Sequence, residues 1–284
     1  LGPLRPDVAS ETGLSGVRVV APGTHDTASA VAAVPASEKP TDEPEWCYVS
    51  LGTWALVGVE RSTPLVTAAC LERNFTNEGG VGGTTRLLKN VCGLWLVQQC
   101  RAHWRRAGQE HSWEELTSLS AAAPALGTII DPDDPSLVAP ADMPEAIRRL
   151  AAAAGEPVPA TVGAVIRTAL ASVAAAIRRT IAELDALVGS RIRRIHVVGG
   201  GVQNRLLCQM VADATGRPVV AGPVEATAIG NLLVQLLARG GTVDLAALRA
   251  VVRDSFALDH YEPRDTARWE ERLRGRTGLT NARR

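Results

Sequence analysis

The sequence has no excess of charge of either sign and no long uncharged hydrophobic run. Thirty acidic residues balance 30 basic residues, so the formal net charge of the 284-residue chain is zero. With 46% hydrophobic residues, this balance argues against general disorder, which needs low hydrophobicity and high net charge. It also argues against a dedicated nucleic-acid-binding protein, which normally has a strongly basic domain. Because no charge-free apolar run reaches about 18 residues, we expect no membrane span.

Lysine and cysteine are scarce. Lys39 and Lys89 are the only lysines among the 30 basic residues, a bias that we attribute to coding composition. The five cysteines are scattered, and no Cys-x-x-Cys motif occurs. An odd number of scattered cysteines predicts free thiols in a reducing compartment and argues against zinc. We therefore expect a cytoplasmic protein.

The beginning of the sequence lacks two common features. Residues 1–16 show no basic-then-apolar signal pattern, and the first residue is Leu1 rather than methionine. The length and apolar content suffice for one large domain or two smaller ones. We expect the sequence to be the C-terminal part of a longer protein.

The hydrophobic pattern predicts alternating strands and helices. Strands are expected over residues 17–21 (buried), 46–51, 54–59, 192–198 and 218–221. Helices are expected over residues 28–34, 87–106, 161–188, 204–215, 226–239 and 245–252. The polar segment 74–83 and the proline-bearing segment 121–144 are expected to be irregular. This order predicts an α/β fold with a central sheet covered by helices.

Two short motifs each have a structural and a functional interpretation. In Gly23–Thr27, Asp26 or Thr27 could cap the helix that follows, or a carboxylate could project at the carboxyl end of a sheet, where α/β enzymes bind ligands. In Ser50–Thr53, free backbone N–H groups and a hydroxyl could hold a phosphate, although most Gly-Thr turns only reverse the chain. Both interpretations stay open for each motif.

Two later motifs also allow two interpretations. On the helix expected over 87–106, Asn90 and Gln98 would be roughly 80° apart around the axis and about 12 Å apart along it. They would contact two parts of one extended ligand, or they are solvated polar residues. The glycines of Val197–Asn204 would let a nucleotide approach the backbone. The spacing is neither a dinucleotide fingerprint nor a P-loop.

Taken in order, these motifs resemble the C-terminal half of the FGGY family of carbohydrate kinases. The resemblance spans about residues 10–265 and rests on Thr24–Val31, Ser50–Trp54, Thr76–Gly80, Arg86–Leu96, Gly199–Asn204 and Ala221–Ala226 with Gly230 and Asn231. The His-Asp-Thr and Asn-Glu-Gly-Gly sequences resemble those of family members that act on L-rhamnulose.

The resemblance implies an actin-like ATPase fold of ribonuclease-H type, with a mixed sheet covered by helices. Family members have two such domains around a cleft, and this chain would supply mainly the second. Residues 1–34 would form a hinge-side segment that carries the catalytic aspartate, and residues 35–265 the C-terminal nucleotide-binding domain. Residues 266–284 would form a peripheral charged tail. The first domain, with its phosphate loop, would precede Leu1.

The resemblance also implies a reaction and its site. The enzyme would transfer the γ-phosphoryl group of ATP, with Mg²⁺, to the 1-hydroxyl of L-rhamnulose, giving L-rhamnulose 1-phosphate and ADP. Asp26 would be the general base, flanked by His25 and Thr27 at the sugar, and Asn90 would also contact the substrate. The positions that match nucleotide contacts are Thr53, Gln98, Gly199, Gly200 and Gly201. The resemblance assigns no metal ligand.

Three alternatives remain beside this interpretation. Another FGGY kinase would act on fuculose, xylulose or glycerol. An inactive truncated nucleotide-binding module would result if the cleft lacks one wall, because such an enzyme cannot close on its substrate. The interrupted glycine pattern argues against the third, a dinucleotide-dependent dehydrogenase. For Lys89, beside Asn90, we favour a structural role.

Overall fold

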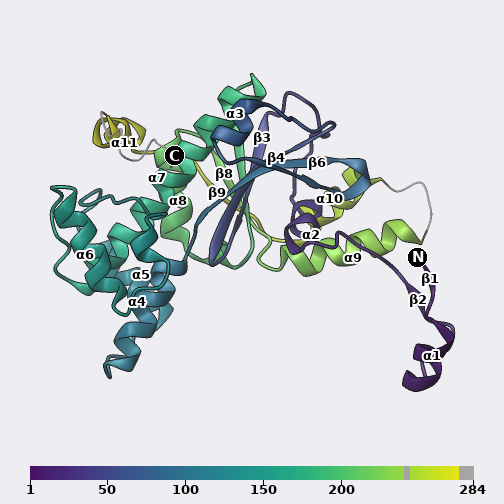
Figure 1. Cartoon of the computed structure of the whole chain (residues 1–284). Helices are drawn as coiled ribbons and strands as arrows, with labels where there is room; N and C mark the ends of the chain where they lie inside the picture. The colour runs from purple at the N-terminus through teal and green to yellow at the C-terminus, as the bar shows by residue number, and fades with distance from the viewer. Residues whose placement is uncertain (240–243, 275–284) are drawn as a thin grey trace.

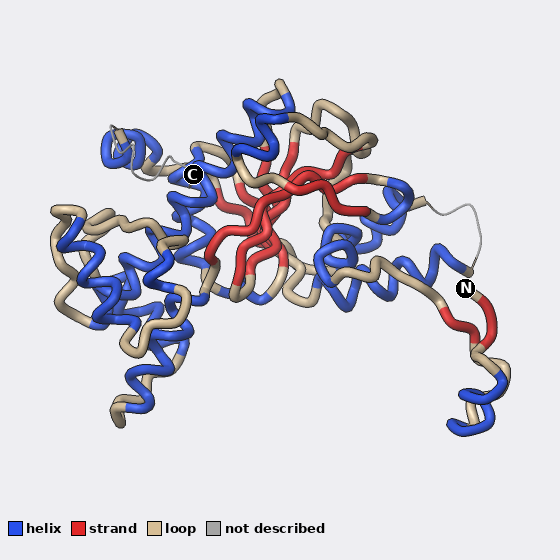
Figure 2. Tube along the Cα trace, in the orientation of Figure 1, coloured by secondary structure: helices blue, strands red, loops and turns tan. Residues whose placement is uncertain are grey.

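The computed structural model describes residues 1–239 and 244–274. Its centre is a seven-stranded mixed sheet in the order β5-β6-β4-β3-β7-β8-β9, drawn in red in Figure 2. The strands are β3 (Trp46–Leu51), β4 (Trp54–Arg61), β5 (Thr76–Gly79), β6 (Thr85–Cys92), β7 (Arg194–Val198), β8 (Val219–Ala221) and β9 (Asp259–Tyr261). Strands β3, β7 and β8 run parallel, whereas β3, β4, β6 and β5 form an antiparallel meander and β9 is antiparallel to β8. The predicted α/β sheet is confirmed.

Helices cover both faces of the sheet (Figure 1). One face carries α7 (Val162–Val188) and α8 (Arg205–Thr215), and the other carries α2 (Asp26–Ala32), α9 (Ala226–Ala238) and α10 (Leu245–Ser255). Each face of the sheet has its own hydrophobic core, and alternate residues of a strand pack into one or the other, since successive side chains point to opposite faces. On β6, Leu87 and Val91 belong to the core under α7, and Leu88 belongs to the core under α2.

The long helix α7 follows the sequence prediction closely. Thr161 caps its N-terminus by accepting a hydrogen bond from the backbone N–H of Ala164, at 3.1 Å. Gly189 ends it in the left-handed conformation, which costs glycine little. Among the described residues, no helix, α7 included, is long and apolar enough to cross a membrane.

A group of shorter helices packs beside α7 (Figure 1). It consists of α4 (Trp95–Arg106), α5 (Trp113–Ala122) and α6 (Met143–Ala153), with the one-turn helix η2 (Pro135–Leu137) in the irregular segment between α5 and α6. The sequence did not predict α5 or α6. The other short elements are α3 (Ala68–Glu72), η1 (Val81–Gly83) and η3 (Gly200–Gln203).

The first 22 residues project from the body as an exposed arm (Figure 1). The arm contains β1 (Gly2–Pro3), α1 (Pro6–Thr12) and β2 (Arg18–Val19), and β1 pairs only with β2. The prediction of a buried strand over 17–21 is therefore wrong, because the observed strand β2 has only two residues and Val17 is 43% exposed. Its apolar residues meet no core within the described chain.

Two other predictions fail around β5 and β6. The segment predicted as a helix over 87–106 is strand β6 up to Cys92, and only its second part forms helix α4. A strand buried on both faces lacks the polar alternation that marks a strand, so its apolar residues imitate helical spacing. The segment predicted as a loop over 74–83 contains β5, an edge strand that pairs only with β6.

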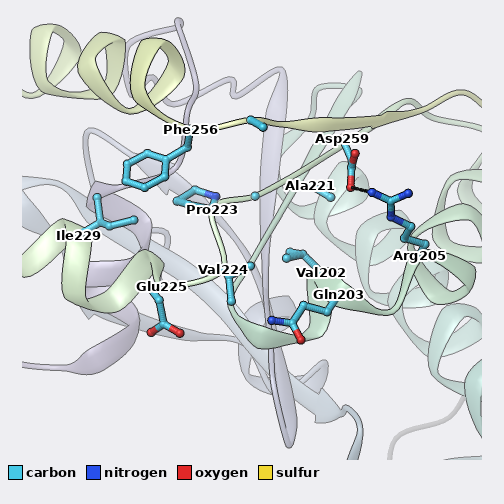
Figure 3. A pocket seen from close by; sticks show the side chains of 12 residues that line it. Val202, Gln203, Arg205, Ala221, Pro223, Val224, Glu225, Ile229, Phe256 and Asp259 are labelled. Atoms are coloured by element: carbon cyan, nitrogen blue, oxygen red, sulfur yellow. Dashed lines mark ion pairs between the residues drawn. The ribbon is translucent and has the colours of Figure 1, made fainter. Parts of the chain in front are cut away.

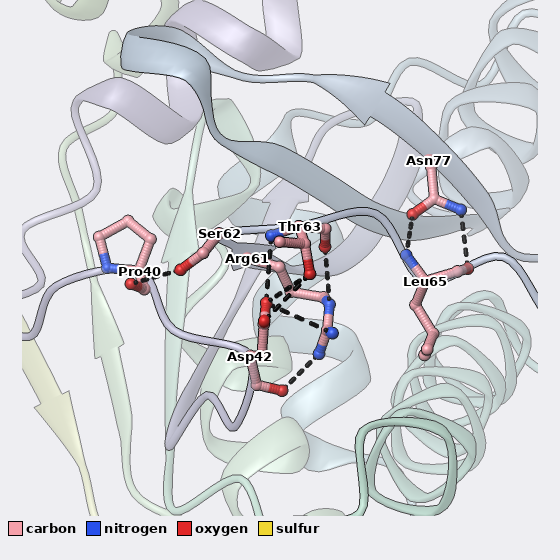
Figure 4. Close-up of polar contacts among 7 residues, drawn as sticks. All are labelled: Pro40, Asp42, Arg61, Ser62, Thr63, Leu65 and Asn77. Atoms are coloured by element: carbon pink, nitrogen blue, oxygen red, sulfur yellow. Dashed lines mark hydrogen bonds and ion pairs between the residues drawn. The ribbon is translucent and has the colours of Figure 1, made fainter.

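The loops that flank β3 and β4 are tied together by side-chain hydrogen bonds (Figure 4). The Arg61 guanidinium contacts Asp42, and its Nε donates to the carbonyl of Thr63 at 3.1 Å. Asn77 of β5 exchanges two 2.9 Å hydrogen bonds with the backbone of Leu65. These contacts tie the segment before β3 to the end of β4, and the loop after β4 to the edge strand β5.

The C-terminal helix α11 (Thr266–Leu273) lies in the segment predicted to be a peripheral tail. Its Trp269 is only 2% exposed and belongs to the core under α7. The prediction of a peripheral tail is therefore wrong for this side chain, and residues 275–284 lie outside the described residues.

All five cysteines are free and buried. The reducing compartment that the sequence suggests stays a prediction.

Candidate functional site at the carboxyl ends of the parallel strands

The three parallel strands end at one edge of the sheet, where α/β proteins commonly bind ligands. Strand β3 runs into Gly52 and Thr53, β7 runs into Gly199, and β8 runs into Gly222. A pocket of about 800 Å³ opens at this edge between the first two turns and helices α4 and α5. Its lining residues are Gly52, Thr53, Leu94, Val97, Gln98, Trp113, Glu114, Thr117, Ser118, Ala121, Gly200, Gly201, Gln203 and Asn204.

The β3–β4 hairpin positions the start of α4 against its own tip. The backbone carbonyls of Gly52 and Thr53 accept hydrogen bonds from the N–H groups of Leu94 and Trp95, at 2.9 and 3.1 Å. One turn further along α4, Oε1 of Gln98 accepts a 3.1 Å hydrogen bond from Oγ1 of Thr53. Two candidate nucleotide-contacting residues from separate elements therefore meet in the pocket.

The three glycines after β7 differ in their surroundings. Gly199 has φ 90°, a conformation that side chains disfavour. A Cβ atom at Gly201 would lie 2.3 Å from Cγ of Leu51, so this glycine lets the turn press against β3. A Cβ atom at Gly200 would meet nothing within 4 Å. Gly200 and Gly201 line the pocket, whereas Gly199 serves the turn behind it.

Helix α5 supplies a wall that sequence reasoning missed. Trp113, its first residue, is 51% exposed and lines the pocket, and the Arg101 guanidinium lies 4.6 Å from its ring centroid. The sequence carries a signal for this helix, because Ser112 caps it by accepting from the N–H of Glu115 at 3.0 Å. Nothing local to that signal shows that the ring faces the glycine turn.

The motif with Asp26 lies on the opposite face of the sheet, at the start of α2. His25 caps this helix, accepting a hydrogen bond from the backbone N–H of Thr27 at 3.2 Å through Nδ1. The predicted cap by Asp26 or Thr27 is therefore wrong. Asp26 and His25 are exposed and Thr27 is 5% exposed. None of the three lines the 800 Å³ pocket.

Asp26 nevertheless lies near the same edge of the sheet. Its backbone carbonyl accepts a 3.4 Å hydrogen bond from Oγ1 of Thr227, in the first turn of α9. Helix α9 begins soon after Ala221, where β8 ends. The expected strand directly before Asp26 is only the exposed β2, so helix packing rather than a strand of the main sheet brings Asp26 to this edge.

Asn90 lies on strand β6, not on a helix. It is exposed, pairs with Leu56 of β4 and lies on the sheet face covered by α2, as Leu88 does. The helical geometry predicted for Asn90 and Gln98 is therefore wrong, and Asn90 does not line the pocket. The neighbouring Lys89 points to the other face and pairs with Glu183 of α7 at 2.9 Å, as its predicted structural role requires.

A second hollow of about 450 Å³ lies at the end of β8 (Figure 3). Pro223, Phe256 and Ile229 give it apolar walls, and Arg205 pairs with Asp259 at 3.3 Å on one side of it. It shares Gln203 with the larger pocket. The edge of the sheet is thus hollowed on both sides of the glycine turn.

The described residues offer no cage for a metal ion. Among them, no group of three or more histidine, cysteine, aspartate or glutamate side chains could hold one. The lining of the larger pocket contains one carboxylate, Glu114. Its other polar side chains are hydroxyls and amides, which together with backbone N–H groups can bind an anion.

The sequence matches the model of the C-terminal domain of the FGGY family of carbohydrate kinases over residues 47–239. The chain belongs to this family. The resemblance found in the motifs is thereby confirmed, and the FGGY match lies inside the segment 35–265 that we assigned to the nucleotide-binding domain. The bounds of that domain stay a prediction.

Curated relatives of this chain include rhamnulokinases from several bacteria. The chain is 43% identical over 270 residues to the rhamnulokinase of Bacteroides thetaiotaomicron. This match covers 95% of this chain and 54% of that protein. The chain is 35% identical over 268 residues to that of Bacillus subtilis, covering 94% of this chain and 54% of that protein. The chain therefore spans about half the length of the relatives it matches.

Solved structures of sugar kinases share the fold. Xylulose kinase from Rhodospirillum rubrum superposes with a TM-score of 0.67 at 21% identity, covering 98% of this chain and 54% of that one. Plasmodium falciparum glycerol kinase with ADP superposes with a TM-score of 0.63 at 14% identity, covering 91% of this chain and 51% of that one. The predicted actin-like fold is confirmed.

Proposed function

We propose that the protein is an ATP-dependent sugar kinase that phosphorylates L-rhamnulose at its 1-hydroxyl, giving L-rhamnulose 1-phosphate and ADP. The observation that carries the proposal is the 800 Å³ pocket in which Thr53, Gln98 and Gly200 converge from three elements. The substrate follows from the relatives, several of which are named rhamnulokinase.

ATP occupies this pocket, with its phosphates at the hairpin tip and its adenosine at the glycine turn. The backbone N–H of Thr53 and the amide N–H groups of Gln98, whose oxygen accepts from the Thr53 hydroxyl, bind phosphate oxygens. Gly200 lets the nucleoside approach the backbone, since no side chain fills the space in front of it. Trp113 and Leu94 supply apolar surface for the base.

Asp26 is the general base of the proposed reaction. Its exposed carboxylate accepts the proton of the sugar hydroxyl while the hydroxyl oxygen bonds to the γ-phosphorus and the bond from that phosphorus to the bridging oxygen of ADP breaks. Such assistance typically accelerates a reaction about 10²- to 10⁴-fold. His25 and Thr27 beside it and Asn90 on β6 are the proposed sugar contacts of this half.

Magnesium would neutralise phosphate charge in such a reaction. The lining residues do not form a site for it, because Glu114 is their one carboxylate. We assign no metal ligand in the described part of the chain, and no step above depends on one.

An ADP-coupled assay on the protein in its full natural length tests the proposal, with L-rhamnulose, L-fuculose, D-xylulose and glycerol as acceptors. We expect L-rhamnulose to give a kcat/KM at least tenfold above the others. A preference for another acceptor would assign the protein to a different FGGY activity. No turnover with any acceptor would favour a nucleotide-binding module. From the 284-residue chain alone we expect little turnover, because the chain spans only about half the length of its rhamnulokinase relatives.

A further inference from the structure

Helix α2, which carries Asp26, takes its position from its neighbours. It has seven residues, and helices this short are not stable by themselves in water. Residues 27–32 are all buried, so packing surrounds the helix beyond its first residue. Whatever packs on α2 therefore determines where the Asp26 carboxylate stands.

Helix α9 lies directly on the backbone of α2. A Cβ atom at Gly230 would stand 1.7 Å from the carbonyl oxygen and 2.6 Å from the carbonyl carbon of Ser29, where real Cβ contacts almost never fall under 3.0 Å. Any side chain at Gly230 therefore requires the two helices to part by roughly 1 Å or more, since close-packed interiors leave no slack. Because glycine is disfavoured inside a helix, its presence in α9 has a packing reason.

Hydrogen bonds hold α2 on both sides of this contact. Oγ1 of Thr227 donates to the carbonyl of Asp26 at 3.4 Å, and Oγ of Ser29 donates to the carbonyl of Gly23 at 2.9 Å. At the other end of the helix, Nη2 of Arg249 in α10 donates to the carbonyl of Val31 at 2.8 Å. Gly230 is the point between these bonds at which α9 meets the helix backbone.

We propose that Gly230 is a positioning residue for the kinase reaction. Because Gly230 has no side chain, α9 can pack directly against the backbone of α2, and this packing holds Asp26 where it reaches the sugar hydroxyl. This inference rests on the proposed function of Asp26 as the base. Gly230 touches no substrate and acts only through the position of α2.

Steady-state kinetics of Gly230→Ala in the full-length protein tests the inference. We expect kcat to fall about 10- to 100-fold, the typical effect of a 1 Å misplacement of a catalytic group. The Kd for ADP should stay within about twofold of wild type, because Gly230 lies outside the nucleotide pocket. Ala228→Ser, which adds one atom on the exposed side of the same helix, is the matched control and should keep the wild-type kcat.

A double variant separates positioning from general damage. If Gly230 acts through Asp26, adding Gly230→Ala to Asp26→Asn lowers kcat no further, whereas additive losses would overturn the inference. If Gly230→Ala does not fold, Thr227→Val, which removes the hydrogen bond to Asp26, takes its place. Thr227→Val should lower kcat a few-fold, and adding it to Asp26→Asn should lower kcat no further. An unchanged kcat in Thr227→Val would overturn the inference. A wild-type kcat in Asp26→Asn would overturn the proposed role of Asp26 as the base. If Asp26→Asn is inactive but Gly230→Ala keeps the full kcat, only the positioning role of Gly230 is overturned.

Discussion

The hydroxyl of Thr53 donates a 3.1 Å hydrogen bond to Oε1 of Gln98, a residue 45 positions further along the chain. The bond joins the β3–β4 hairpin tip to α4 at the floor of the 800 Å³ pocket. It engages the amide oxygen of Gln98 and leaves the amide N–H groups to donate to a ligand. The two side chains thus hold each other in place where we propose that the nucleotide binds.

Removing this pair should weaken nucleotide binding. We expect Gln98→Leu to raise the Kd for ADP about fivefold, because a neutral hydrogen bond contributes about 1 kcal/mol. Isothermal titration calorimetry on the full-length protein measures the change. Gln99→Leu, next to it on α4 but outside the pocket lining, is the matched control. Equal Kd values for the two variants would remove Gln98 from the nucleotide site.

Filling the space in front of Gly200 should also weaken nucleotide binding. We expect Gly200→Val to raise the Kd for ADP at least tenfold through steric exclusion, and Gly200→Ala to raise it less. The melting temperature should change little, because a Cβ atom there meets nothing within 4 Å. Calorimetry with a thermal melt checks both expectations. Unchanged ADP affinity in Gly200→Val would place the nucleotide elsewhere.

Breaking the buried ion pair of Glu60 and Arg249 should destabilise the fold. The two side chains lie 2.8 Å apart and are 1% and 2% exposed. Glu60→Gln leaves the Arg249 charge buried without its partner, which typically costs about 3–5 kcal/mol. Urea unfolding should show this loss of stability. Glu38→Gln, which breaks the exposed ion pair of Glu38 with Arg194, should cost far less. Equal effects would mean that the buried charge is compensated in another way.

The buried imidazole of His196 should make the protein sensitive to acid. Burial lowers its pKa to about 3, and its ring packs edge-on against Trp46 with centroids 5.7 Å apart. The unfolded chain takes up a proton near pH 6.5 and the folded protein does not, so stability is full above pH 6.5 and falls as the pH drops towards 3. The slope is at most about 1.4 kcal/mol per pH unit.

Urea unfolding between pH 7.5 and 5 measures this slope, with His196→Phe as the comparison. The difference between wild type and variant isolates His196 from the other groups that titrate in this range. We expect a flatter dependence in the variant. Parallel curves would mean that His196 is protonated in the folded protein or reaches solvent.

The parts of the fold that local sequence determines could be predicted. Helix α7 has a cap at Thr161, a stop at Gly189 and apolar residues at helical spacing between them. The hairpin at Gly52 and the strand before Gly199 are equally local, since each pairs an apolar run with a turn. The resemblance to a family then indicated which of these turns to propose as ligand-binding sites.

The rest depends on contacts that no local pattern encodes. Strand β6 is buried on both faces because helices cover both sides of the sheet, and its apolar pairs Leu87–Leu88 and Val91–Cys92 therefore imitated a helix. His25 rather than Asp26 caps α2, a choice between neighbouring side chains that backbone geometry decides. Trp113 reaches the pocket only through the packing of α5 on α7.

We propose Asp26 as the base of a sugar kinase whose nucleotide binds on the other side of the sheet edge. The decisive experiment is Asp26→Asn in the full-length protein, with kcat from the ADP-coupled assay and the Kd for ADP from calorimetry. We expect kcat to fall about 10²- to 10⁴-fold while the Kd for ADP stays nearly unchanged. A kcat close to that of the wild type would contradict it.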